Sequence, residues 1–233
     1  MDRATRKDLK SDKFALEVQH GVEYVTGHRQ MLMRWGAVAA AAVLVVLAVY
    51  LYMGHQSGVR QEAFQAAQRV EDATVGPAQN EYSMTFPTQA EKDKAADKAW
   101  SDLAVRFSGS QEGVIAQLYL GGHAADKGNL QEAAKRFQVV IDNGSANYAS
   151  LAKLALAQVD ASQGKIDDAR KLLQSLIDHP SATVSKEQAT ITLAHILAAS
   201  NPQAARKLLE PLRAHERSSV SRAALTAISE LPK

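Results

Sequence analysis

Residues 128–141 have the sequence GNLQEAAKRFQVVI, and the pattern returns at 164–177 (GKIDDARKLLQSLI) and at 200–213 (SNPQAARKLLEPLR). A small residue opens each block, an alanine stands near its middle, and a large apolar residue follows, each repeating at a step of 36 residues. These positions are Gly128, Gly164 and Ser200; Ala133, Ala169 and Ala205; and Phe137, Leu173 and Leu209. An internal period of this length predicts one structural unit stacked several times.

A second helical segment precedes each block, at 114–126, 151–163 and 188–199, and each carries one small residue: Gly121, Ala157 and Ala194. The third copy matches only with a one-residue deletion near the turn. The pattern predicts helical hairpins in which small residues, such as Gly121 and Ala133, face each other and let the backbones approach. Glycine at the turn supplies the left-handed conformation. A single hairpin leaves an apolar face uncovered, so the hairpins are expected to stack.

The flanking segments extend this all-α arrangement. Residues 91–107 are predicted to supply the second helix of an atypical first repeat, with Trp100 in the place of Phe137. Residues 218–230 are predicted to form a capping helix, with one face that consists of Val220, Ala223, Ala224, Ala227 and Ile228. We therefore assign 91–233 to the repeat domain and 54–90 to a helical stalk and linker. The stalk is expected to begin with a flexible stretch at 54–58 and to end at a proline-containing linker over 76–90.

Residues 35–53, WGAVAAAAVLVVLAVYLYM, contain no charged side chain. A helix of this length rises about 28 Å, close to the hydrocarbon thickness of a bilayer. Aromatic residues stand at both ends, where the membrane interfaces would lie. A buried helix of a soluble protein and a cleaved signal peptide are the alternatives. The 34 residues that precede the stretch and the absence of a small-residue cleavage site favour an uncleaved transmembrane helix.

The N-terminal segment, 1–34, carries seven Lys/Arg and five Asp/Glu, whereas the rest of the chain carries 20 of each. This bias predicts a cytoplasmic N-terminus and a C-terminal domain across the membrane. Within the segment, Phe14, Val18, Val22 and Val25 form the apolar stripe of a short amphipathic helix. That helix would either rest on the inner leaflet or dock a cytoplasmic partner.

The sequence lacks the usual signals of chemistry. Cysteine is absent, the seven histidines have no metal-ligand spacing, and no phosphate loop or concentrated basic patch occurs. We expect no enzyme activity, metal, cofactor, nucleic acid or small-molecule substrate. The remaining expected function is protein binding. The first helices of stacked hairpins line a concave face, which is the expected binding surface. The candidate contact residues are Gln117, Tyr119, Tyr148, Lys153 and Gln158.

The motif G-x-x-x-x-A-x-x-x-[FL] resembles the tetratricopeptide repeat (TPR), and Gly128, Ala133 and Phe137 fit it well. The period of 36 rather than 34 residues and Ser200 in place of glycine depart from the family pattern. The whole layout resembles the ancillary subunit of the SecYEG translocon. That resemblance implies a bacterial inner-membrane protein whose periplasmic domain contacts translocon subunits, chaperones or emerging chains. A scaffold for cell-envelope assembly or division, without a translocon link, is the alternative.

Overall fold

The computed structural model describes residues 29–77 and 84–232. The chain divides into two compact units, Met1–Val59 and Arg60–Lys233. The amphipathic helix predicted around Phe14, Val18, Val22 and Val25 lies outside the described residues.

Helix α2 (Arg29–Glu71) contains the apolar stretch and is long and apolar enough to cross a membrane. The side chains of this stretch are exposed rather than packed in a protein core; Val43, for example, is 66% exposed. The flexible stretch expected at 54–58 is wrong, because α2 continues through it. Two glycines in a helix cost about 1 kcal/mol each, and the alanine- and glutamine-rich residues that follow favour continuation.

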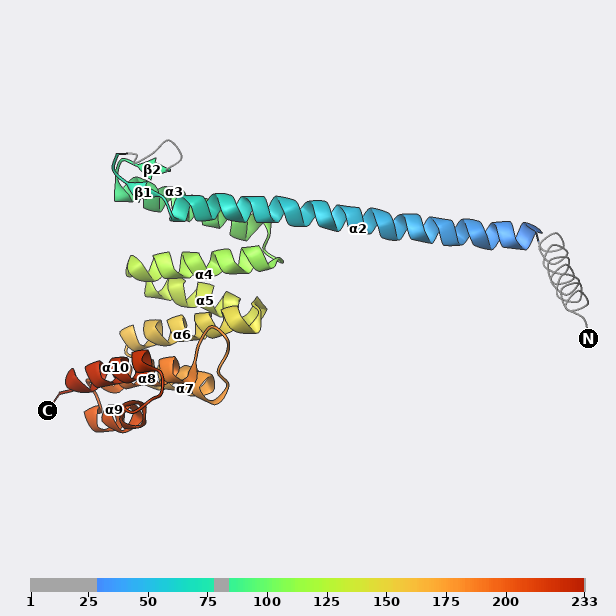
Figure 1. Ribbon diagram of the computed structural model, residues 1–233. Helices are drawn as coiled ribbons and strands as arrows, with labels where there is room; N and C mark the ends of the chain where they lie inside the picture. Colours follow the sequence, from blue (N-terminus) through green and yellow to red (C-terminus); the bar gives the residue numbers. More distant parts are fainter. Residues whose placement is uncertain (1–28, 78–83, 233) are drawn as a thin grey trace, which may run out of the picture. The chain divides into compact units, whose positions relative to one another are not determined.

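The second unit is a stack of helical hairpins (Figure 1). From α4 onward, each hairpin packs a first helix on the second helix that follows it in the chain, and α10 packs on α8 and α9. The last turn-rich segment before α10 includes a short 3-10 helix. The elements that follow α2 are α3 (Gln89–Arg106), α4 (Gln111–Asp126), α5 (Leu130–Asn143), α6 (Ala146–Ser162), α7 (Ile166–Asp178), α8 (Lys186–Leu197), α9 (Pro202–Leu209), η1 (Glu210–Leu212) and α10 (Ser218–Ser229).

The turns inside the hairpins follow the sequence pattern in two of three cases. Gly128 (φ 76°) and Gly164 (φ 78°) adopt the left-handed conformation between α4 and α5 and between α6 and α7. The turn from α8 to α9 needs no such residue. There the Asn201 side chain caps α9 by accepting a hydrogen bond from the backbone N–H of Ala204, and Pro202 starts the helix. This explains how Ser200 replaces glycine.

The repeated small and large residues form the core. The alanines Ala133, Ala157, Ala169, Ala194 and Ala205 are fully buried, as are Leu173 and Leu209, and Phe137 is 3% exposed. The pairing expected for Gly121 is different from that observed. A Cβ on Gly121 would lie 2.6 Å from Cε1 of Phe137, so the small residue makes room for the Phe137 ring.

The packed unit begins earlier than the sequence analysis placed it. Ala63, Phe64, Ala67 and Val70 of α2 pack in one cluster with Trp100 of α3. The end of α2 is therefore the first helix of the first hairpin rather than a separate stalk. As predicted, α3 is the second helix, with Trp100 fully buried.

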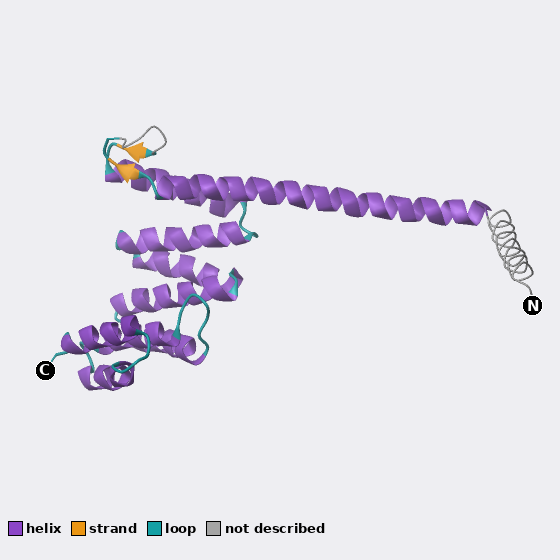
Figure 2. Cartoon of the chain, in the orientation of Figure 1, coloured by secondary structure: helices purple, strands orange, loops and turns teal. Residues whose placement is uncertain are grey.

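A short parallel pairing was not expected in an all-α chain (Figure 2). Strand β1 (Thr74–Val75) follows α2, and β2 (Thr85–Phe86) precedes α3; Thr74 pairs with Thr85 and Val75 with Phe86. The β-branched and aromatic residues favour extended backbone. Their pairing satisfies backbone groups where the sequence predicted a linker.

The capping helix is present, with Ala224 and Ala227 buried, although Ala223 is exposed. Its start is tied to α8 through Glu187, whose Oε1 lies 3.3 Å from His215 Nε2 and 3.4 Å from Arg217 Nη2. Hydrogen bonds from its own backbone N–H and from Ser185, helped by these two neighbours, hold the pKa of Glu187 below its ordinary value.

Candidate functional site

A groove of about 500 Å³ lies on the first helices of the first three hairpins. We call it the first-helix groove. Its walls come from the end of α2, from α4 and from the start of α6. The lining residues are Phe64, Gln68, Glu71, Ile115, Leu118, Tyr119, Gly122, His123, Asp126, Tyr148 and Leu151.

An aromatic stack supports the groove from beneath. The rings of Tyr119 and Trp100 stack in parallel, with centroids 4.1 Å apart and an interplanar angle of 5°. Phe64 meets Trp100 edge to face at 5.6 Å. Because Trp100 is fully buried between the first two hairpins, Tyr119 is held in a fixed position in the groove.

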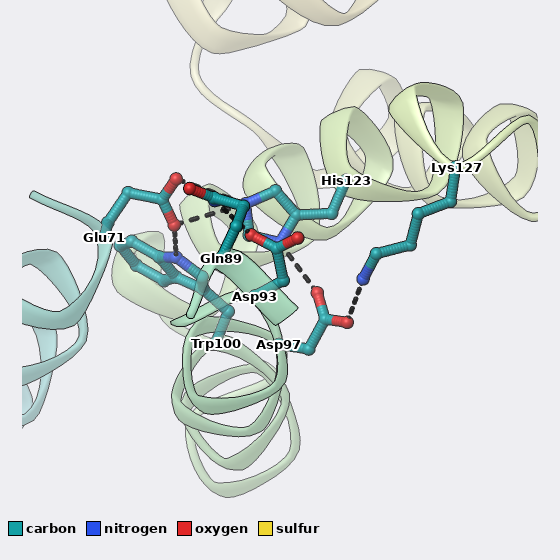
Figure 3. A network of polar contacts seen from close by, with 7 residues as sticks. All are labelled: Glu71, Gln89, Asp93, Asp97, Trp100, His123 and Lys127. Carbon is teal, nitrogen blue, oxygen red and sulfur yellow. Dashed lines mark hydrogen bonds and ion pairs between the residues drawn. The ribbon is translucent and has the colours of Figure 1, made fainter. Parts of the chain in front are cut away.

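A polar network joins α2, α3 and α4 at one end of the groove (Figure 3). The Trp100 indole N–H donates to Glu71 Oε2 at 2.8 Å. The two ring nitrogens of His123 lie 3.2 Å from Glu71 Oε2 and 2.8 Å from Asp97 Oδ1. Lys127 donates to the other oxygen of Asp97. The network therefore fixes the carboxylate of Glu71 at the groove wall.

Two groups near the groove have shifted pKa values. Burial opposes ionisation of Asp97, but hydrogen bonds from Lys127 and His123 and the nearby charges outweigh it and lower the pKa of that carboxyl. Burial raises the pKa of the Tyr119 phenol, and the negative charges of Glu71 and Asp72 raise it further. Tyr119 is therefore an un-ionised phenol near the carboxylates of Glu71 and Asp72.

The structure places two of the five predicted contact residues in the groove: Tyr119 and Tyr148. Gln117 instead accepts a hydrogen bond from Arg136 of α5 at 2.8 Å, within its own hairpin. Lys153 is half-buried and Gln158 is exposed on α6, and neither lines the groove. Whether any of the five contacts a partner stays a prediction.

Sequence reasoning missed Phe64, Glu71 and His123. Phe64 and Glu71 fall in the predicted stalk, and the spacing of the histidines predicts no metal site at His123. The available signal was the repeat itself, because an incomplete first hairpin needs a first helix, and the residues before the linker are the nearest helical candidate.

The arrangement offers binding rather than an obvious reaction centre. Within residues 29–77 and 84–232, no group of three or more His, Asp or Glu side chains is placed to hold a metal ion. The carboxylates of Glu71 and Asp97 are instead occupied by Trp100, His123 and Lys127. What the groove presents to a ligand is apolar surface, two tyrosines and a few fixed polar groups, as protein-binding surfaces do.

Comparisons with known proteins agree with this geometry. A search of curated proteins gives no match. The family model described as a tetratricopeptide repeat-like domain matches residues 30–174 and again 143–219. Together these matches run from the membrane-spanning candidate to the start of α10 and cover most of the chain, which therefore belongs to the tetratricopeptide repeat-like domain family.

Proposed function

We propose that this chain is a membrane-anchored protein-binding module that serves the protein translocon and its periplasmic chaperones. The observation that carries the proposal is a repeat unit with a groove on its first helices in the same chain as a helix apolar enough to span a membrane. Tetratricopeptide repeat-like domains are generally protein-interaction modules without catalytic activity. The translocon link is supported by the resemblance of the layout to the ancillary SecYEG subunit.

The proposed location is the bacterial inner membrane, with the N-terminus in the cytoplasm and the repeat unit in the periplasm. The excess of positive charge in residues 1–34 supports that orientation. Anchoring confines the groove to the membrane and raises its effective concentration near emerging chains. The role is then to hold chaperones or chains beside the channel, which needs no reaction at the groove.

The test is purification of tagged full-length protein in mild detergent, followed by mass spectrometry. One variant, Tyr148→Ala, removes an aromatic side chain from the groove. The matched control, Val139→Ala, trims an apolar side chain on α5 that is 41% exposed and lies outside the groove. A third form replaces residues 35–53 with an unrelated transmembrane segment.

We expect channel subunits and periplasmic chaperones with the wild type and with Val139→Ala, and reduced chaperone recovery with Tyr148→Ala. Loss of channel subunits on replacement of the span would place that contact in the membrane. If no form brings channel subunits, the translocon role is wrong and an envelope scaffold becomes the better hypothesis.

A further inference from the structure

The first-helix groove has a direction. The end of α2 and helix α4 run the same way along it, since Arg60 Nε lies 3.4 Å from Glu112 Oε2 near one end, and Glu71 meets His123 near the other. We call the end near Arg60 and Glu112 the N-terminal end of the groove, and the end near Glu71 and His123 its C-terminal end.

The N-terminal end is apolar. Aromatic side chains of α2 and α6 line it together with aliphatic side chains of α4 and α6, and none of these residues is charged. The residues at this end are Phe64, Ile115, Leu118, Tyr148 and Leu151. A surface of this composition gains from covering an aliphatic or aromatic side chain of a partner.

The C-terminal end is negatively charged. Glu71 and Asp126 line it, with His123 as the single basic group among the lining residues. Glu71 ends α2 and Asp126 ends α4. Glu71 has a structural role, because it accepts a hydrogen bond from Trp100 and contacts His123. Among the described residues Asp126 has no such contact, and a carboxylate at a helix C-terminus opposes the helix dipole, so helix stability does not account for Asp126.

Asp126 is available to a ligand. It is exposed, and in the part of the chain that the structure describes it forms no ion pair. The neighbouring Lys127 is directed to Asp97 instead. Burial raises the pKa of the Tyr119 phenol, and the nearby carboxylates of Glu71 and Asp72 raise it further, which is consistent with the carboxylates that line this end.

We infer that the groove binds a partner segment in which an aliphatic or aromatic side chain stands next to a lysine or arginine. The apolar side chain lies among Phe64, Leu118 and Tyr148, and the cation pairs with Asp126. Glu71, whose carboxylate is already held by Trp100 and His123, adds negative charge nearby but is not the cation's partner. This inference rests on the proposed function as a protein-binding module and specifies the chemistry of its ligand. A partner with an acidic residue at that position is disfavoured by the same carboxylates.

The test uses the full-length protein in lipid nanodiscs and two fluorescein-labelled peptides, Ser-Gly-Leu-Phe-Lys-Gly-Ser and its twin with glutamate in place of lysine. Affinity is measured by fluorescence anisotropy. The lysine peptide should bind about fivefold more tightly than its twin at low ionic strength. This ratio is expected when one exposed attractive charge pair is replaced by a repulsive one. Added salt should reduce that ratio.

Asp126→Lys should abolish or reverse the preference. Asp178→Lys is the matched control, since Asp178 is likewise an exposed last residue of a helix, α7, and lies outside the groove. It should leave the ratio unchanged. Circular dichroism checks that both variants fold.

Equal affinity of the two peptides, or a ratio that Asp126→Lys does not change, overturns the charge assignment while the groove remains a protein-binding site. Absence of binding by either peptide also overturns the inference. Neither result decides the translocon role, which depends on co-purification. Conversely, a peptide preference as expected together with no channel subunits would retain this inference and remove the translocon link.

Discussion

Gly121 and Gly122 are adjacent in α4, yet alanine should have opposite effects at the two positions. A Cβ at Gly121 would lie 2.6 Å from Cε1 and 2.8 Å from Cδ1 of the buried Phe137 ring. A Cβ at Gly122 meets nothing within 4 Å. Both residues are inside the helix, so both substitutions gain the same helix propensity.

The magnitudes follow from these contacts. Replacing glycine by alanine in a helix interior gains about 1 kcal/mol. At Gly122 this is the whole effect, so Gly122→Ala should raise the free energy of unfolding by about that amount. At Gly121 the ring must move in a packed core, which costs about 1–3 kcal/mol. Because the propensity gain is common to both, the difference between the variants equals this packing cost.

The assay is urea unfolding of full-length protein in nanodiscs, in a Trp35→Phe background. Trp100 is then the remaining tryptophan, and it is buried between the first hairpin and α4, the helix that contains both glycines. Its fluorescence reports local unfolding even if the repeat array does not unfold as one unit. With an m-value of about 2 kcal/mol per M, the Gly121→Ala midpoint should be lower than the Gly122→Ala midpoint by about 0.5–1.5 M urea. Equal midpoints, or a higher one for Gly121→Ala, would refute the reasoning.

Three further outcomes are expected. Leu173→Ala, at a fully buried position, should lower the free energy of unfolding by about 3 kcal/mol, whereas exposed Val139→Ala should change it by less than about 0.5 kcal/mol, both measured by urea titration. Trp100→Phe removes the indole donor to Glu71 and should cost about 2 kcal/mol, read by circular dichroism. Because the fold lowers the pKa of Asp97 from its ordinary value of 3.8, the ionised carboxylate stabilises the fold at pH values above 3.8. Asp97→Asn should therefore be less stable than wild type near neutral pH, with the gap closing on acidification; a constant gap would contradict this.

Much of the hairpin packing was predictable because the repeat encodes it. The alanines at Ala133, Ala169 and Ala205 and the large residues four positions later were identified from their spacing alone, and all are buried. Their roles are local: each depends on a hairpin whose two helices lie next to each other in sequence. Such contacts repeat with the period and so become visible in one chain.

The features that were missed depend on contacts between segments without a periodic signal. The pairing of Thr74 with Thr85 crosses the expected linker, and Glu71 meets His123 across 52 residues. Gln117 illustrates a different failure. The repeat places Gln117 on a first helix. A shift of one residue in the repeat register decides whether its side chain faces the groove or Arg136, and the sequence does not determine that register.

Helix α10 has a consequence for assembly. It packs against α8 and α9, the surface on which another hairpin would otherwise stack. Apart from Leu225, its exposed side is small or polar, with Arg222, Thr226 and Ser229. The uncapped end of a repeat array exposes an apolar surface. A neighbouring molecule can stack on that surface as if it were the next hairpin, and repeated stacking would form a filament. In this protein α10 covers that end of the array. The contacts of Glu187 with His215 and Arg217 tie the residues just before α10 to α8.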